Sequence, residues 1–580
     1  MTTRRFVTLL VAAAALAAAL RLAFPLADPP WGPTVGIVWH DEGAWVHNAR
    51  NRALFGEWRL DDWNPMYIAP VFSGLEYLSF SLFGVGLAQA RLVSMLAGIL
   101  SVVLLALAVT RLAGRRAGLV AAALLATNHL AVMYSRAALM EATMVAFLVA
   151  AWYCAVRAER QAWWALGASL CALLAYFTKA SAVFFGLGLG LLAVLALVEC
   201  WRRDRRVVGW GRTHEGRVAL WTLAGLAAGT AIALLTFVVP NWSEYWFYNW
   251  QMSVTRKPSY TLKALADRVS WFPIVHDIFT RMWLITTVGI VWAAGAAWLW
   301  HKRTFGERVL LTWLALGTFE LVARDTGNER YFVYLVPALV AAAALALGRD
   351  GRLLPVAARD VPRSRALCAL PVVLAMAYLV TGSVVRLAFL YEVRPGVRWA
   401  AGAAVLLTVL VYARWQTVMR WLSDDSVRPR AATLLVALVL AGDLAQYGQW
   451  AASRTYWNYG AMRLVADRLP PDTLVHGKLA NGLSLESRIR PVFVGREFGN
   501  YDDRLHRDDI RYVLTYVRPR VGYEGRVITE VLDAYPRHRV LWTVPVAESA
   551  WGRDLAALIE KTPADTTGRA ATDGRDRADH

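Results

Sequence analysis

The sequence has little cysteine and far less acid than base. Four cysteines occur in 580 residues and none has a CxxC partner, so neither a zinc site nor a disulfide framework is indicated. Lys and Arg together number 62 against 43 Asp and Glu, which gives a net charge of +19. These basic residues cluster at the ends of apolar runs, and no compact basic domain accompanies them. Membrane topology and anionic lipid therefore explain the charge better than nucleic-acid binding.

Charged residues are scarce, at 18% of the chain, whereas 57% of the residues are apolar. Such a composition excludes a water-soluble core of this size. We predict a mainly α-helical, polytopic membrane protein with about thirteen spans, because each apolar run is long enough to cross a bilayer as a helix. The predicted spans are residues 5–24, 87–110, 117–134, 138–156, 162–178, 181–200, 218–239, 282–300, 307–323, 331–348, 366–386, 398–413 and 431–448.

The short loops indicate the orientation of the chain in the plasma membrane. Arginine clusters, such as the run from Arg202 to Arg206, all fall on one side if thirteen helices alternate. This side is cytoplasmic by the positive-inside rule, so we expect a cytoplasmic N-terminus and an extracytoplasmic chain after about residue 449. Residues 5–24 resemble a signal peptide, but the apolar run is too long and the cleavage site is poor. We predict a retained anchor there.

Three segments outside the predicted spans are too long to be simple connections: residues 25–86, residues 240–281 and the chain from 449 onward. In the first, Trp45, Ala49, Arg52 and Ala53 keep helical spacing, which predicts a helix along the membrane surface. The second begins with closely spaced Trp and Tyr residues, as in an aromatic belt, and continues into a basic loop.

The third segment predicts a small α/β domain. Strand-like runs at residues 473–475, 491–494, 511–514 and 540–542 alternate with helical stretches. After about residue 562 the sequence loses periodicity and is predicted to be disordered. We therefore expect a membrane domain over 1–350 with its outer loop 25–86, additional spans over 351–448, an extracytoplasmic α/β domain over 449–562, and a disordered tail over 563–580.

Ionisable residues gather at the outer ends of the predicted spans, where they are costly and often functional. They are Asp41, Glu42, Arg136, Glu141, Lys179, Glu320, Arg324, Arg330 and Asp443. Ordinary roles remain open for several. Asp41 suits a helix N-cap, Glu141 and Arg136 suit an ion pair, and Lys179 suits a snorkelling residue.

A metal site is a further alternative in the first outer loop. His40 and His47 flank the acidic pair and would bind a metal together with Asp41. Their seven-residue spacing, however, matches no strong ligand motif. No cofactor is therefore required by the sequence, and a divalent metal is left open but not indicated.

Four short segments, in this order along residues 1–350, resemble the GT-C glycosyltransferases. Within that superfamily they are most similar to the branch of protein O-mannosyltransferases and lipid A aminoarabinose transferases. The segments are Trp39-His40-Asp41-Glu42-Gly43-Ala44, Tyr134-Ser135-Arg136-Ala137-Ala138-Leu139-Met140-Glu141, Phe177-Thr178-Lys179, and Arg330-Tyr331-Phe332 before Pro337.

The resemblance implies a role for each matched residue. Asp41 is the candidate general base, Glu42 supports it or the fold, and Glu141 is a second acid of the site. Basic residues are candidates to hold the phosphate of the donor: Arg136 and Lys179, and more weakly Arg256, Lys257 and Arg330.

The expected function is transfer of a sugar, a hexose or a pentose, from a polyprenyl-phosphate donor to a hydroxyl acceptor. The acceptor is a lipid, a cell-wall glycan or a protein, and membrane lipids are the other expected partners. Inversion is expected because no second carboxylate is evidently placed as a nucleophile. The alternatives are a transporter or a flippase for lipid-linked sugars, and a non-catalytic scaffold.

Overall fold

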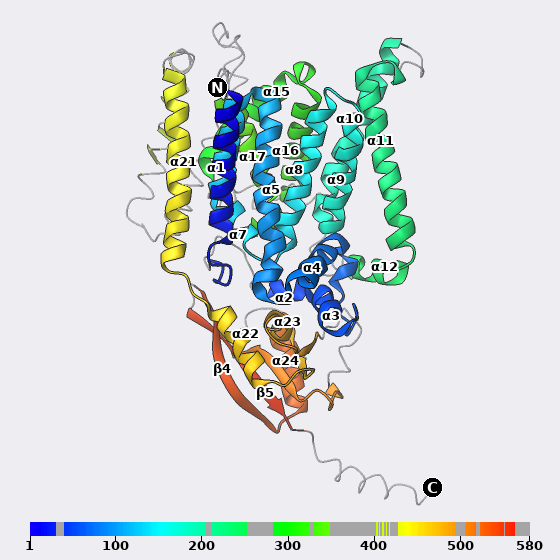
Figure 1. Ribbon diagram of the computed structural model, residues 1–580, viewed down its shortest axis with the longest axis vertical. Helices are drawn as coiled ribbons and strands as arrows, with labels where there is room; N and C mark the ends of the chain where they lie inside the picture. Colours follow the sequence, from blue (N-terminus) through cyan, green and yellow to red (C-terminus); the bar gives the residue numbers. More distant parts are fainter. Residues whose placement is uncertain are drawn as a thin grey trace, which may run out of the picture.

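The computed structural model describes residues 1–30, 40–204, 210–251, 282–323, 329–348, 427–493, 505–517, 523–549 and 552–562, together with single positions between 399 and 417. A bundle of long helices occupies one end of the molecule, and a small sheet with short helices occupies the other (Figure 1). The N-terminus lies at the end of the bundle that is farther from the sheet (Figure 1).

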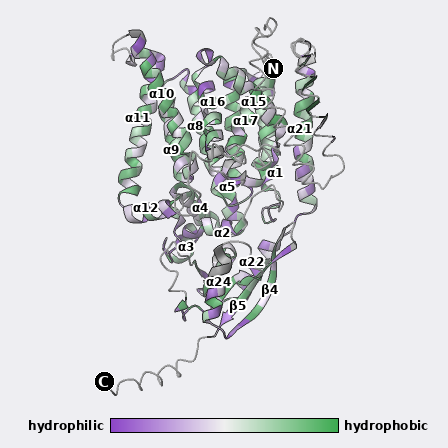
Figure 2. Ribbon diagram, turned by 180° about the vertical axis from the view of Figure 1, so that it is seen from behind, coloured by the Kyte–Doolittle hydropathy of each residue, from purple (hydrophilic) through white to green (hydrophobic). Residues whose placement is uncertain are grey.

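The bundle consists of apolar helices whose hydrophobic residues extend along their length (Figure 2). Its helices are α1 (Thr3–Leu22), α5 (Leu87–Ala113), α6 (Arg115–Thr127), α7 (His129–Ser135), α8 (Met140–Ala158), α9 (Trp164–Thr178), α10 (Val183–Asp204), α11 (His214–Ala233), α15 (Trp283–Trp298), α16 (Phe305–Ala323), α17 (Leu335–Gly348) and α21 (Val427–Ala452). Among the described residues, six helices are long and apolar enough to cross a membrane, or seven if the bent pair α6 and α7 forms one span.

These helices confirm a polytopic helical membrane fold. Helices lie over every predicted span except 366–386 and most of 398–413, which fall outside the described residues. The predicted number of thirteen is therefore not confirmed. The span predicted at 117–134 differs in shape, because α6 and α7 meet at an angle of 58° near Asn128. The Asn128 side chain accepts a hydrogen bond from the Ala131 N–H and so begins a new helix there.

The first outer loop folds into short helices beneath the bundle: α2 (Asp41–Trp45), α3 (His47–Phe55), η1 (Pro65–Tyr67) and α4 (Pro70–Phe83). The position of α3 confirms the helix predicted from residue spacing. Asp41 is the first residue of α2 and His40 is its N-cap residue, so the N-cap alternative for Asp41 is wrong.

The second outer segment begins as a helix after α11. Residues Leu234–Val238 continue α11 as a π-helical turn, and α12 (Trp242–Trp250) follows. Trp242, Trp246 and Trp250 stack in series on α12, with ring centroids 5.7 and 5.4 Å apart. All three are about half exposed, as expected for a belt at a membrane surface. Residues 252–281, which include Arg256 and Lys257, lie outside the described residues.

The α/β region contains one five-stranded sheet, in the order β2-β1-β3-β5-β4. Its elements are α22 (Trp457–Arg468), β1 (Leu474–His476), α23 (Lys478–Gly482), β2 (Arg490–Val492), β3 (Tyr512–Tyr516), α24 (Tyr523–Ala534), β4 (His538–Ser549) and β5 (Gly552–Lys561). Strand β1 pairs in parallel with β2 and β3, whereas β5 pairs antiparallel with β3 and β4. Each of the four predicted strand runs overlaps a strand, with boundaries that differ by one residue or more. Strand β5 is absent from the prediction, because its Leu-Ala-Ala-Leu-Ile run has no strand periodicity.

Buried polar contacts attach the sheet region to the first outer loop. Arg50 of α3 is fully buried and donates hydrogen bonds to the carbonyls of Ser484, Ser487 and Ile489, at 3.1, 2.9 and 2.9 Å. Helix α23 packs so closely on α2 that a Cβ atom at Gly43 would lie 2.0 Å from the Asn481 carbonyl oxygen. The outer loop and the sheet therefore form one packed unit.

We expect Arg50→Leu to lower the free energy of unfolding by about 3 kcal/mol, because three buried carbonyls lose their donor and each is worth about 1 kcal/mol. Thermal unfolding and tryptic digestion of the sheet region measure the effect. Arg52→Leu is the matched control, since Arg52 lies on the same helix and is exposed. Equal stability of the two variants would contradict the role given to Arg50.

Candidate active site

The carboxylate of Asp41 lies where the helical bundle meets the outer loop. Its Oδ2 accepts a hydrogen bond from Arg330 Nη1 at 2.5 Å, and its Oδ1 lies 3.7 Å from His40 Nε2. The Asp41 side chain keeps 16% of its surface exposed. Asp41 is thus an oriented and partly exposed carboxylate.

Arg330 joins Asp41 to a second acid. It lies in the short helix η9 (Glu329–Phe332), and its Nε donates to Glu141 Oε1 at 2.6 Å. Burial alone would lower the pKa of Arg330, but the carboxylates of Glu141 and Asp41 outweigh burial and raise that pKa. The guanidinium therefore stays charged while it bridges the two acids.

Lys179 completes the cluster from the end of α9. Its Nζ donates to Glu141 Oε1 at 2.5 Å and lies 5.2 Å from the centre of the Tyr331 ring. Glu141, in the first turn of α8, is fully buried. One buried carboxylate thus holds two cations, and Asp41 adds the second negative charge. Helices α2, α8 and α9 and the short helix η9 each supply one residue of this charge-balanced set.

Glu42, the neighbour of Asp41, makes a buried ion pair. Arg91 of α5 binds both of its carboxylate oxygens, at 2.8 and 2.7 Å, and the backbone N–H of Ala138 donates to Oε1 at 2.8 Å. The Glu42 side chain is 1% exposed. These contacts favour the supporting role for Glu42 over a direct part in proton transfer.

The Arg136 side chain contacts backbone carbonyls and an aromatic ring. Its guanidinium donates to the carbonyls of Leu20, Arg21 and Phe24, at 2.8 to 2.9 Å, and lies 4.4 Å from the ring centre of Trp450. Arg136 therefore satisfies the Leu20 and Arg21 carbonyls in the last turn of α1 and also binds the Phe24 carbonyl just beyond that helix. Glu141 pairs with Lys179 and Arg330 instead of Arg136.

The remaining predicted positions lie elsewhere or outside the described residues. Glu320 accepts a hydrogen bond from the Tyr334 hydroxyl, and Asp443 accepts one from the backbone N–H of His129. Residue Arg324 falls outside the described residues. These contacts place Glu320 beside Tyr334, which directly precedes α17, and Asp443 beside His129 of α7.

A contact from the sheet region also reaches the site. The hydroxyl of Tyr516, at the end of β3, lies 2.9 Å from His40 Nδ1. His40 thus stands between Tyr516 and the carboxylate of Asp41. Sequence reasoning missed Tyr516, because 476 positions separate it from His40 and no motif surrounds it.

The two histidines that flank the acidic pair have different partners. His47 is buried and bonds Asp61 at 2.8 Å and the side chain of Asn481 at 3.0 Å. Over the described ranges, no group of three or more His, Cys, Asp or Glu side chains is arranged to hold a metal ion.

The arrangement around Asp41 offers a carboxylate and two cations, which suit proton transfer and anion binding.

The contacts of Glu42 predict that Glu42→Gln lowers the free energy of unfolding by about 3 to 5 kcal/mol, since it leaves the Arg91 guanidinium buried without a counter-charge. Thermal unfolding of the purified protein measures this loss. The matched control is Glu57→Gln, which makes the same change at an exposed position of the same loop. A thermal midpoint equal to that of the control would disprove the supporting role.

Comparisons with known proteins agree with this architecture. Residues 68–209 match the family model described as dolichyl-phosphate-mannose-protein mannosyltransferase. This segment contains Glu141 and Lys179 and begins after Asp41. A comparison with curated proteins gives no match.

The chain is similar over nearly its whole length to solved structures of ArnT from Cupriavidus metallidurans. With ArnT bound to undecaprenyl phosphate, identity is 19% and the TM-score 0.53, covering 96% of this chain and 98% of that chain. With apo ArnT, identity is 17% and the TM-score 0.51, at the same coverage. The oligosaccharyltransferase of Archaeoglobus fulgidus gives 12% identity and a TM-score of 0.46, covering 89% of this chain and 69% of that chain. The chain therefore shares the fold of the ArnT structures, and its residues 68–209 are similar to the dolichyl-phosphate-mannose-protein mannosyltransferase family.

Proposed function

We propose that the protein transfers a sugar from a polyprenyl-phosphate donor to a hydroxyl acceptor, with Asp41 as the general base. The observation that carries this proposal is the cluster of Asp41, Arg330, Glu141 and Lys179. It combines a partly exposed carboxylate with two cations in one hydrogen-bonded set. The structure of ArnT with undecaprenyl phosphate supports a polyprenyl phosphate as the lipid part of the donor.

The reaction proceeds in one displacement. The acceptor oxygen forms a bond to the anomeric carbon of the sugar while the bond from that carbon to the phosphate oxygen breaks. The acceptor's proton passes to Asp41, and the bonding electron pair leaves with the polyprenyl phosphate. A single displacement inverts the anomeric configuration.

Lys179 and Arg330 are the residues that receive the departing phosphate. A phosphate that is already a fair leaving group needs charge neutralisation more than protonation. The fully buried carboxylate of Glu141 holds both cations in place before the donor binds, so little reorganisation is needed at the moment of transfer. Glu141 therefore acts in this proposal as an organiser of the cations. Arg136 serves the fold.

The pairing of Asp41 with Arg330 has a consequence for the base. A guanidinium beside a carboxylate favours its ionised form, which is the form that accepts a proton. The same pairing makes Asp41 a weak base. Weak basicity suffices if the proton moves only as the new bond to the sugar forms.

The position of this cluster supports an orientation of the chain in the membrane. Helix α2, which begins with Asp41, lies at the end of the bundle that carries the sheet, opposite the N-terminus (Figure 1). With the arginine-rich loops on the cytoplasmic side, the cluster faces the outer side of the plasma membrane, where polyprenyl-linked sugars are used. The predicted division of the chain, with the membrane part as the catalytic domain and residues 449–562 as an extracytoplasmic domain, fits this orientation.

We expect Asp41→Asn to lower turnover by at least about 100-fold, because an amide cannot take the acceptor's proton. The measurement is transfer of label from synthetic polyprenyl-phosphate sugars by the purified protein in lipid. Asp467→Asn, the same change at an exposed aspartate of α22, serves as the control. Normal turnover by Asp41→Asn would exclude it as the base.

A second prediction concerns the donor. Lys179→Gln should weaken binding of undecaprenyl phosphate by about tenfold or more, because a charge-assisted hydrogen bond to phosphate is lost. Binding is measured by titration in nanodiscs, with Lys302→Gln, an exposed site in the bundle, as the control. If wild type and Lys179→Gln bind equally, Lys179 does not hold the donor. If the wild type moves a lipid-linked sugar across the membrane without consuming it, the transporter alternative replaces this proposal.

A further inference from the structure

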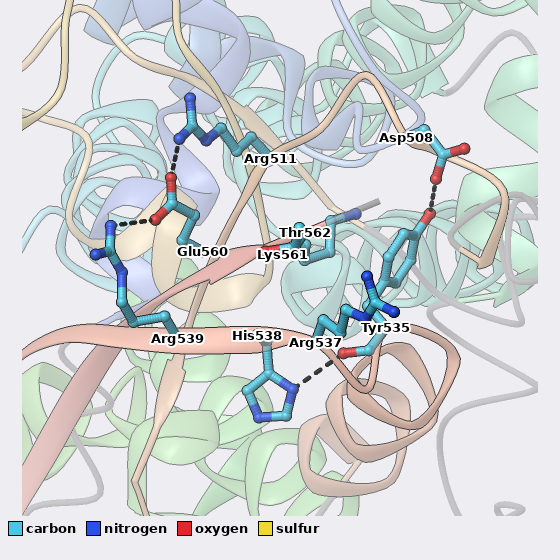
Figure 3. A pocket seen from close by; sticks show the side chains of 9 residues that line it. All are labelled: Asp508, Arg511, Tyr535, Arg537, His538, Arg539, Glu560, Lys561 and Thr562. Carbon is cyan, nitrogen blue, oxygen red and sulfur yellow. Dashed lines mark hydrogen bonds and ion pairs between the residues drawn. The ribbon is translucent and has the colours of Figure 1, made fainter. Parts of the chain in front are cut away.

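The sheet region contains a cavity of about 600 Å³ that is separate from the Asp41 cluster. Residues from the starts of β3 and β4 and from the end of β5 line it (Figure 3). This end of the sheet faces away from the helical bundle (Figure 1). Strand β3 thus begins beside the cavity, next to Arg511, and ends with Tyr516 at His40.

A carboxylate at the cavity orients two arginines. Glu560 binds Arg539 at 2.7 Å through one oxygen and Arg511 through the other, and Figure 3 shows the two side chains reaching Glu560 from different sides. The Glu560 side chain is 9% exposed, whereas the arginine side chains are 64% and 73% exposed. Because each guanidinium has five N–H donors, both arginines keep donors for a further anion.

Lys561 adds a buried cation to the same cavity. The residue is 2% exposed, and its Nζ donates to the Arg507 carbonyl at 3.0 Å and lies 4.3 Å from the centre of the Tyr535 ring. Burial lowers the pKa of Lys561 to about 8. A neighbouring anion would offset the cost of burying this ammonium group.

The balance of charge around the cavity is positive. Three arginines and Lys561 line it against the carboxylates of Asp508 and Glu560, which leaves two positive charges unbalanced. Asp508 accepts a hydrogen bond from the Tyr535 hydroxyl at 2.6 Å. The volume exceeds that of a single phosphate and lies within the range of about 300 to 1,000 Å³ that small-molecule sites occupy.

We propose that this cavity binds an anionic oligosaccharide, one that carries carboxylate or phosphate groups. The arginines and Lys561 bind the acidic groups, and the volume accommodates the sugar units that carry them. The position at the far end of the sheet from the bundle makes the headgroup of a membrane lipid the poorer fit. The site does not depend on the transfer chemistry proposed for Asp41.

The test is a titration of the full-length protein in nanodiscs of neutral lipid. The probes are an oligogalacturonate, a phosphorylated maltodextrin and an unmodified maltodextrin. We expect the acidic probes to bind about tenfold or more tightly than the neutral one. The double variant Arg539→Gln/Lys561→Gln should abolish this preference, because it removes two of the four cations.

Arg463→Gln is the matched control, since Arg463 is a half-exposed arginine of the same region that also pairs with a carboxylate. Thermal unfolding checks that the double variant is folded. The proposal is overturned if the folded double variant binds the acidic probes as the wild type does, or if the neutral probe binds equally well. Equal binding of inorganic phosphate or short-chain phosphatidylglycerol would assign the cavity to a simple ion or a lipid headgroup and would also overturn it.

Discussion

The buried ion pair between Glu42 and Arg91 fixes the candidate active site to the membrane bundle. Arg91 belongs to α5, one of the longest apolar helices, and Glu42 is the second residue of the five-residue helix α2. So short a helix has little stability of its own. The bidentate pair and the Ala138 N–H therefore determine where α2 lies. Asp41 precedes Glu42 directly, so its position follows from the same contacts.

Balanced charges reduce the cost of burying ionisable residues where the helical bundle meets the outer loop. Asp41 and Glu141 offset Arg330 and Lys179, and each cation has a carboxylate within 2.6 Å. A buried pair of this kind contributes little net stability, because desolvation costs nearly as much as the attraction returns. The phosphate binding proposed for Lys179 and Arg330 would give the cluster a role other than stability. A phosphate that enters beside two cations in a region of low dielectric is held more strongly than it would be in water.

The sequence was sufficient to predict this cluster in outline and insufficient to predict its pairing. Asp41, Glu141 and Lys179 were candidates because charge at the end of an apolar span is costly, and the resemblance to the GT-C glycosyltransferases assigned them roles in the site. The alternative partner for Glu141, Arg136, is only five positions away, yet its guanidinium lies on the carbonyls of α1. Helix packing, which no local pattern encodes, decides between the two. Strand β5 was missed for the same kind of reason, since pairing with β3 and β4 overrides its sequence.

The sheet region is part of the site as well as a neighbour of it. Tyr516 reaches His40, whose other ring nitrogen faces Asp41, and α23 packs against α2 at Gly43 without room for a side chain. A shift of the sheet would therefore move the residues on both sides of the carboxylate. For the general base proposed at Asp41, such displacements would reduce catalysis, because proton transfer depends on the position of the base. Strand β3, with five residues, thus connects the cavity beside Arg511 to the contact between Tyr516 and His40.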